Sequence, residues 1–363
     1  MTKTKRVASS ADAFNSHFSK QYGERWSALH AALLAATRYA ALFNRYASET
    51  DFHDQVDKAF DHRDLQRLLL PGTSDSKAGE ISAYVVDSDA GLFPPPGSSK
   101  SSLLTHWNLD AASLLPVHLL NVQPGDRLLD LCAAPGGKSV AIAQSIWPHL
   151  HAGSANAETN VGLGCLHSNE IDGNRNKRLT ENLKAYLPPQ LLVGDHVKVL
   201  RVDAAAGAQS LPLGIGGYDK VLVDAPCSSE RHLIHAQAKA ELSGRVSDEM
   251  ARWSPTASKR LAKTQAELLM TALKAVRVGG KIVYATCSLS EDENDGVVEK
   301  VIAQIGKERK KGSIQWSVKL ELHQDELDEW AERTKHGWIV LPDHPSGGRW
   351  GPLFFAVLVK IVE

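Results

Sequence analysis

The segment Arg127-Leu-Leu-Asp-Leu-Cys-Ala-Ala-Pro-Gly-Gly-Lys-Ser139 decides the fold of this chain. It begins with an apolar run that is typical of a buried strand. Gly136 and Gly137 follow, and their backbone can approach a ligand closely because glycine has no side chain. The helix expected after them begins with N–H groups that can bind an anion. This order predicts one strand–turn–helix unit of an α/β sheet.

The alternation of strands and helices continues after this segment. The other predicted strands are Cys165–Asn169, Val197–Val202, Lys220–Val223, Lys281–Ala285 and Leu353–Ile361. The Gly/Asn-rich stretch Gly153–Gly164 predicts a surface insertion. A capping-box pattern at Ser290–Glu293 predicts the start of a helix that runs to Val301, and it explains the acidic residues there without a catalytic role.

The N-terminal part has a different pattern. Residues from about Ala11 to Leu70 have the composition and spacing of helices. Pro71-Gly72 ends this part, and a Gly/Pro/Ser-rich stretch through Phe93–Ser99 is typical of a linker. We therefore divide the chain into an N-terminal helical region with its linker, residues 1–105, and an α/β catalytic domain, residues 106–363.

Composition limits the kinds of partner. No apolar run is long enough to cross a bilayer, so no membrane partner is expected. The formal net charge of -1 means that nucleic-acid binding would need local positive charge or a partner protein. No hydrophobic signal segment precedes the cysteines, which favours reduced thiols in a reducing compartment. The basic start Met1–Arg6 is a feature of mitochondrial presequences, although Asp12 soon interrupts it.

Acidic residues follow successive predicted strands at Glu170, Asp203 and Asp224. Such residues are often turn or cap residues, but the carboxyl ends of parallel strands also form the ligand-binding edge of an open sheet. There Glu170 can accept from ribose hydroxyls and Asp203 from an adenine amine. The glycine spacing before Lys138 fits neither a Walker loop nor a dinucleotide site. S-adenosylmethionine, a nucleoside that carries a carboxylate, fits this edge better.

Two cysteines follow two of the predicted strands, in Asp224-Ala-Pro-Cys227-Ser228 and in Ala285-Thr-Cys287-Ser288. A buried cysteine often serves as a small apolar residue, and either one alone could do so. Together with Asp224, however, the two thiols can meet in one pocket. They could then add a sulfur atom to a pyrimidine ring and later remove it.

These motifs resemble the Nop/Sun family of RNA cytosine-5 methyltransferases. Asp110–Val117, Ser229–His232 and Gly351–Phe355 are similar to its mitochondrial ribosomal-RNA branch. The resemblance implies a class I (Rossmann-like) S-adenosylmethionine-dependent methyltransferase fold and a cytosine in RNA. Ribosomal RNA is the favoured substrate and transfer RNA the alternative. The resemblance also implies a mitochondrial location and reliance on a helical-repeat partner protein.

The resemblance further implies roles for single residues. Cys287 is the expected nucleophile and Cys227 the residue that assists product release, while Asp224 lies between the cofactor and the base. A free cysteine has a pKa of about 8.5, so Cys287 needs activation, and the positive end of the helix predicted at Ser290 is a candidate source. The residues expected to contact the cofactor are Gly136, Gly137, Lys138, Glu170, Arg175, Asp203 and Asp224.

Three alternatives stay open at this point. Cys227 could attack instead of Cys287, as in DNA cytosine methyltransferases. The chain could be an RNA-binding ribosome-assembly factor whose methylation is secondary. It could also be a small-molecule methyltransferase of the same fold, a function that needs neither cysteine. No metal site is expected.

Overall fold

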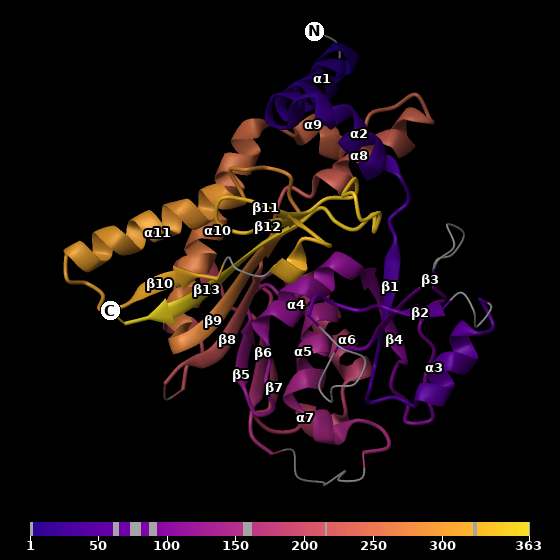
Figure 1. The fold of residues 1–363 in the computed structure, drawn as a ribbon, viewed down its shortest axis with the longest axis vertical. Coiled ribbons are helices and arrows are strands. Elements are labelled where there is room, and N and C mark those ends of the chain that lie inside the picture. Colours follow the sequence, from indigo (N-terminus) through magenta and orange to yellow (C-terminus); the bar gives the residue numbers. More distant parts are fainter. Residues whose placement is uncertain are drawn as a thin grey trace.

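The computed structural model describes residues 3–60, 65–72, 81–86, 93–154, 162–214, 216–321 and 325–362. Within these ranges, nine strands form the central sheet in the order β11-β12-β13-β9-β8-β5-β6-β7, with β10 paired to β13 (Figure 1). The strands of this sheet are β5 (Arg127–Asp130), β6 (Cys165–Asn169), β7 (Val197–Leu200), β8 (Tyr218–Asp224), β9 (Val276–Thr286), β10 (Ser317–Leu320), β11 (Glu332–Arg333), β12 (Trp338–Val340) and β13 (Leu353–Ile361).

The strand order explains where a ligand can bind. Strands β7, β6, β5, β8 and β9 run parallel, and β13 joins β9 in the antiparallel direction. From β5 the chain passes to β6 and β7 on one side, and it later returns to β8 and β9 on the other. The order therefore switches between β5 and β8, and ligands of open α/β sheets bind at the carboxyl ends of the strands at such a switch.

Helices cover the two faces of the sheet (Figure 1). The helices after residue 110 are α4 (Leu115–Leu120), α5 (Gly137–Ile146), α6 (Gly173–Tyr186), α7 (Pro189–Leu192), α8 (Glu230–Glu241), α9 (Asp248–Arg252), α10 (Pro255–Ala275) and α11 (Asp295–Lys310). Successive residues of a strand point to opposite faces. Leu128 and Leu129 of β5 accordingly belong to two separate hydrophobic clusters, and both are fully buried. The predicted α/β fold and its main strands are confirmed.

The N-terminal part combines helices with a small antiparallel sheet. Its helices are α1 (Lys3–Tyr22), α2 (Trp26–Leu34) and α3 (Glu49–Val56), and its sheet has the order β2 (Leu65–Arg67), β3 (Ala83–Val86), β1 (Tyr39–Phe43) and β4 (His106–Asp110). The helical prediction for Ala11–Leu70 is confirmed for the three helices but wrong for β1 and β2. The Ala/Leu-rich segment β1 is a strand because it pairs with both β3 and β4 and buries four of its five side chains.

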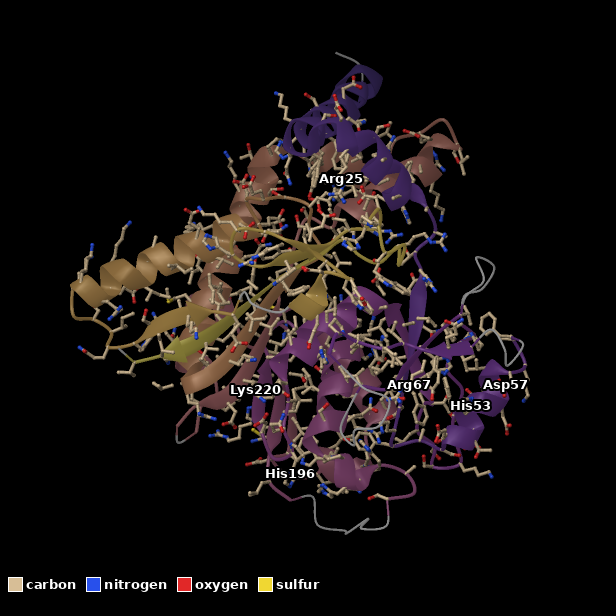
Figure 2. All side chains as sticks on the ribbon, viewed as in Figure 1. Arg25, His53, Asp57, Arg67, His196 and Lys220 are labelled. Atoms are coloured by element: carbon tan, nitrogen blue, oxygen red, sulfur yellow. The ribbon has the colours of Figure 1, made fainter. Side chains whose placement is uncertain are left out.

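The N-terminal helices are tied to the C-terminal strands. Arg25, labelled in Figure 2, forms ion pairs of 2.5 Å with Glu332 and 2.7 Å with Asp343. Strand β4, at the start of the predicted catalytic domain, pairs with β1 of the preceding region. The division of the chain at residue 105 stays a prediction, and these contacts join its two parts.

Two other predictions meet the structure only in part. The segment Ser290–Glu293 does not cap a helix, because it ends in a turn and α11 begins at Asp295. The predicted surface insertion Gly153–Gly164 lies in part outside the described residues. Among the residues that are described, no helix has both the length and the apolar character needed to span a membrane.

Candidate active site

The two cysteines meet at the carboxyl edge of the sheet. Cys227 follows β8 and Cys287 follows β9, and their Sγ atoms lie 3.0 Å apart. Both are free thiols, and Cys287 is the exposed one. The sequence prediction that both thiols share one site is consistent with this geometry. Parallel pairing of Asp224 with Ala285 sets the two strands in the register that brings the cysteines together.

A serine that the sequence analysis missed completes the thiol pair. The Oγ atom of Ser229 lies 3.0 Å from Sγ of Cys287 and 3.5 Å from Sγ of Cys227. Ser229 has a left-handed backbone conformation with φ 52°, which is uncommon for a residue with a side chain and typical of strained functional turns. It is also the N-cap of α8, so Cys287 lies beside the positive end of that helix rather than of a helix at Ser290.

The surroundings distinguish the two thiols. A hydrogen bond from Cys227 lowers the pKa of the Cys287 thiol; desolvation of the sulfur by the surrounding protein opposes this effect, and a hydrogen bond with Ser229 lowers the pKa further. The same contact, together with burial, raises the pKa of Cys227. Cys287 is therefore the thiol that ionises more readily, and the thiolate is the nucleophilic form of cysteine.

A lysine–aspartate pair lies next to the thiols. Nζ of Lys138, in the first turn of α5, is 2.7 Å from Oδ2 of Asp224 at the end of β8. Burial opposes the charge on Lys138, but the adjacent Asp224 carboxylate outweighs this and raises the pKa of the lysine. Asp224 is also one of the charges that act on Cys287. The pair thus joins the glycine turn to the thiol site.

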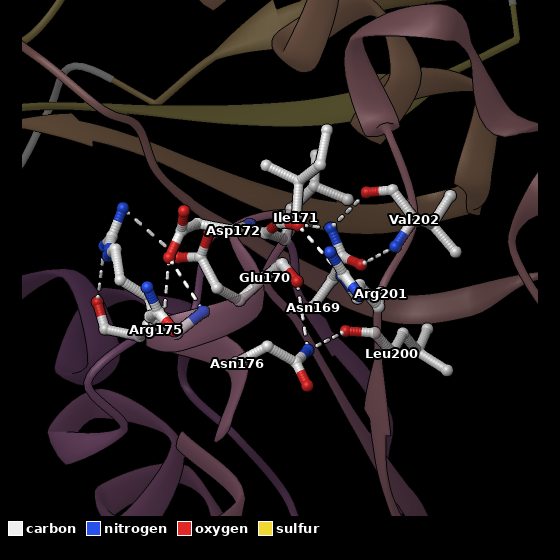
Figure 3. A network of polar contacts seen from close by, with 12 residues as sticks. Asn169, Glu170, Ile171, Asp172, Arg175, Asn176, Leu200, Arg201 and Val202 are labelled. Atoms are coloured by element: carbon white, nitrogen blue, oxygen red, sulfur yellow. Dashed lines mark hydrogen bonds and ion pairs between the residues drawn. The ribbon is translucent and has the colours of Figure 1, made fainter. Parts of the chain in front are cut away.

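Glu170 follows β6 with its carboxylate almost completely buried (Figure 3). Its Oε1 accepts from the N–H of Asp172 at 2.9 Å, and its Oε2 lies 3.2 Å from the guanidinium of Arg175. Arg175 also donates to the carbonyl of Ala134 at 3.0 Å, in the turn after β5. A carboxylate has about four acceptor positions, so these two contacts leave room for a ligand's hydroxyl groups.

Asn169 holds the same edge together and was not found from the sequence. Its side chain donates to the carbonyls of Leu131 and Val202, each at 3.1 Å, and accepts from the N–H of Val202 at 2.8 Å (Figure 3). It therefore connects the chain segments that follow β5 and β7. An asparagine at a strand end has no local signal for such a role, because both partners are distant in the sequence.

The conformation and packing of the glycine turn depend on the surrounding protein. Gly136 has a φ of 118°, which favours glycine, and it is the N-cap of α5. A Cβ atom on Gly137 would lie 2.8 Å from Nε1 of Trp107. Each position thus needs a glycine within the fold. Asp203, the remaining predicted cofactor residue, follows β7, is exposed, and accepts from the N–H of Ala205 at 3.1 Å.

A cavity of about 200 Å³ opens beside the Cys287 thiol. Cys287, Ser229 and His232 line one part of it, and Asp110 and Pro352 another. Lys138 and Asp224 are not among the residues that line this cavity.

Asp130 supplies a prediction about stability. Burial raises its pKa from 3.8 to about 7, and the Asp224 carboxylate adds to the rise. The folded state therefore holds a proton that the unfolded state has lost, so stability falls by about 1.4 kcal/mol per pH unit between these two values. Asp130→Asn keeps an acceptor for the Ser139 hydroxyl, which lies at 2.6 Å, and removes this dependence.

Urea unfolding of both proteins from pH 5 to pH 8 tests this prediction. The variant should gain stability relative to the wild type as the pH rises to about 7, and the difference should then level off. Parallel profiles for the two proteins would show that Asp130 is already ionised in the folded state.

Comparison with known proteins identifies the family. A family model described as 16S rRNA methyltransferase RsmB/F matches residues 117–328, more than half of the chain. A mitochondrial tRNA (cytosine(34)-C(5))-methyltransferase of Danio rerio is 33% identical over 358 residues, which cover 96% of this chain and 86% of that protein. The 5-cytosine rRNA methyltransferase NSUN4 of Mus musculus is 28% identical over 371 residues, with 96% and 87% covered.

Solved structures agree on the fold. The structure of NSun6 from Pyrococcus horikoshii with SFG has a TM-score of 0.61 and 18% identity, and the match covers 97% of this chain and 98% of that one. At this identity the match shows a shared fold. The family model and the relatives together show that the chain belongs to the RsmB/F (Nop/Sun) family of S-adenosylmethionine-dependent RNA cytosine-5 methyltransferases, as its motifs predicted.

Proposed function

We propose that this protein methylates carbon-5 of a cytosine in mitochondrial ribosomal RNA through a covalent bond between Cys287 and the base. The observation that carries the proposal is the thiol pair: Sγ of Cys287 lies 3.0 Å from both Sγ of Cys227 and Oγ of Ser229, at the carboxyl edge of a methyltransferase sheet. A small-molecule methyltransferase of this fold has no need for two adjacent thiols.

In the proposed reaction, the thiols and the Lys138–Asp224 pair each have a separate role. The thiolate of Cys287 adds to carbon-6 of the cytosine, and the electron pair of the ring double bond makes carbon-5 nucleophilic. Asp224 accepts from the exocyclic amine, and Lys138 holds that carboxylate in place at 2.7 Å. Bound S-adenosylmethionine supplies an electrophilic methyl group. Cys227, or a water that it orients, then accepts the carbon-5 proton; the double bond re-forms and Cys287 leaves as a thiolate.

The proposed cofactor cradle runs along three strand ends. The N–H groups at the start of α5, after Gly136 and Gly137, would bind the carboxylate of the amino-acid end. Glu170 would accept from the ribose hydroxyls, with Arg175 holding its carboxylate at 3.2 Å. Asp203, exposed at the end of β7, would accept from the adenine amine.

Glu170→Gln tests this cradle. Losing a charged acceptor costs about 1.5–3 kcal/mol, so the Kd for S-adenosylhomocysteine should rise by about 10- to 100-fold. Isothermal titration calorimetry measures this change directly. Glu181→Gln is the matched control, because Glu181 lies on the exposed face of α6, the helix that follows Glu170. An unchanged Kd in Glu170→Gln would place the ribose elsewhere.

The class of RNA has two candidates. The RsmB/F description and the NSUN4 relatives, named as rRNA methyltransferases, support ribosomal RNA. The 33% identity to the Danio rerio enzyme, named as a mitochondrial tRNA methyltransferase, supports transfer RNA as the second candidate. The name of the Danio rerio enzyme also supports a mitochondrial location. This chain has a formal net charge of -1, so it has no overall positive charge with which to bind RNA. A helical-repeat partner protein that adds positive charge would help it to bind either class of RNA.

Bisulfite sequencing of RNA from cells that carry Cys287→Ala, beside wild-type cells, tests the proposed function. A cytosine in mitochondrial ribosomal RNA should lose its methylation in the variant. Loss confined to a transfer RNA would select the second candidate. Unchanged methylation with defective ribosome assembly in cells that lack the protein would favour the assembly-factor alternative.

A further inference from the structure

A buried carboxyl group joins the two thiol loops from behind. Ser228 follows Cys227, and Ser288 follows Cys287. The Oγ atoms of these two serines lie 2.8 Å apart, and both hydrogen-bond to Oε1 of Glu230, Ser288 at 3.3 Å. Glu230 begins helix α8, and its side chain is completely shielded from solvent. One carboxyl oxygen therefore contacts a residue next to each cysteine.

The other oxygen of Glu230 extends this connection. Oε2 accepts from the backbone N–H of Leu289 at 2.8 Å, two residues beyond Cys287. The carbonyl of Leu289 in turn accepts from Gln21 of α1 at 2.6 Å. The Cys287 loop is thus held both by Glu230 and by the N-terminal helix.

A second buried carboxyl group, on the Cys287 side, hydrogen-bonds to the loop that holds Cys227. Glu293, in the turn after the Cys287 loop, accepts from the N–H of Ser228 at 3.1 Å and from Gln265 at 2.9 Å. Glu293 is also completely buried. The capping-box pattern at Ser290–Glu293 predicts only a local role for this residue. In the fold it joins the turn that follows one cysteine loop to the residue that follows the other cysteine.

The contacts around Glu230 accommodate a neutral carboxyl group. Three oxygens in mutual contact, from Glu230, Ser228 and Ser288, need three protons for three hydrogen bonds, and the serines supply two. Burial raises the pKa of Glu230 to about 7, and the charge of Glu293 adds to this rise. A protonated Glu230 supplies the third proton and avoids a buried charge beside the thiols.

We propose that Glu230 is a positioning residue that sets the separation of the Cys227 and Cys287 thiols by hydrogen-bonding to both loops. The proposal rests on the proposed function, in which both thiols act on one cytosine. Glu230 itself touches neither the cytosine nor the cofactor. It acts through Ser228 and Ser288, each one residue from a reacting sulfur.

Two substitutions distinguish positioning by the hydrogen bonds of Glu230 from mere packing of its side chain. Glu230→Ala removes all the hydrogen bonds that the Glu230 side chain makes to the two loops. Glu230→Gln preserves them, because its amide oxygen can accept from the N–H of Leu289 and its amide NH₂ can donate to the serine hydroxyls. Glu241→Ala, at the exposed end of the same helix, is the control. Circular dichroism and Tm verify that each variant is folded.

The first readout measures thiol geometry without RNA. Diamide should oxidise Cys227 and Cys287 to a disulfide: two thiols lose two protons and two electrons, which reduce diamide to the hydrazine. Peptide mapping follows the rate. A misplacement of about 1 Å should slow this reaction roughly tenfold in Glu230→Ala, whereas Glu230→Gln and Glu241→Ala should stay near the wild-type rate.

The second readout is methylation. Glu230→Ala should lower kcat by about 100-fold and leave KM for RNA nearly unchanged, and Glu230→Gln should restore most of kcat. If Glu230→Ala does not fold, Ser288→Ala, which removes one of the serine contacts of Glu230, should show both effects at a smaller size. Wild-type disulfide and methylation rates in Glu230→Ala would overturn the proposal and leave the methyltransferase assignment intact. A slowed disulfide in a chain that methylates no RNA would support the positioning role and reject the proposed function.

Discussion

Cys287→Ala is expected to abolish methylation and covalent attachment to RNA. Cys287 is the exposed thiol, and the hydrogen bond from Cys227 lowers its pKa, so it is the sulfur that can attack as a thiolate. Removing the nucleophile of an enzyme that forms a covalent intermediate lowers kcat on the order of 10⁶-fold. Methyl transfer from radiolabelled S-adenosylmethionine measures this loss, and RNA that carries 5-fluorocytosine at the target tests attachment, because fluorine cannot leave carbon-5 as a proton does.

Cys165→Ala is the matched control for this experiment. Cys165 is a free cysteine at the first residue of β6, and this parallel strand places it at the opposite edge of the sheet from Glu170. The control should methylate RNA and form the adduct at the wild-type rate. If Cys287→Ala still formed the adduct, the attacking sulfur would be Cys227, as in the DNA enzymes.

Cys227→Ser is expected to have the opposite effect on the adduct. The hydrogen bond to Cys287 and burial raise the pKa of Cys227, so its thiolate, once formed, is the stronger base of the two and lies 3.0 Å from the Cys287 sulfur. A serine hydroxyl is a far weaker base than a thiolate, so addition and methyl transfer should proceed while release stops. RNA–protein adduct should therefore accumulate toward one RNA per protein, visible as a slower band on a denaturing gel.

The double variant Cys227→Ser/Cys287→Ala verifies the order of events. The adduct should disappear in it, because without the Cys287 sulfur no covalent bond to the base can form. A Cys227→Ser protein that turns over RNA at the wild-type rate would leave product release to another group, and Ser229, 3.0 Å from the Cys287 sulfur, is the nearest candidate.

Local sequence patterns predicted much of the candidate site because strand ends are local features. An apolar run followed by an acid or a cysteine indicates where a buried strand stops, and parallel strands stop at one edge. In the structure Asp224 is the last residue of a strand, and Glu170, Asp203, Cys227 and Cys287 follow strands. The roles proposed for them are still to be tested, but their positions at that edge follow from the pattern.

The errors came from segments whose structure depends on distant partners. Tyr39–Phe43 has a helix-forming composition, yet it is a strand because β3 and β4 pair with it. Ser290–Glu293 has the pattern of a helix cap, yet Glu293 reaches Ser228 in another loop. In both cases hydrogen bonds to residues far along the chain outweigh a local preference of about 1 kcal/mol or less per residue.

The sequence by itself determined the alternating sheet, its glycine turn and the presence of two cysteines at strand ends, because each of these is encoded within about ten consecutive residues. Only the tertiary structure decided which thiol ionises, since this depends on the contacts of Cys287 with Cys227 and Ser229. It also decided that Glu230 joins the two loops, through a contact with Leu289 that spans 59 residues of chain. Hydrogen bonds of this kind depend on positions that only the complete fold provides, and no local pattern records them.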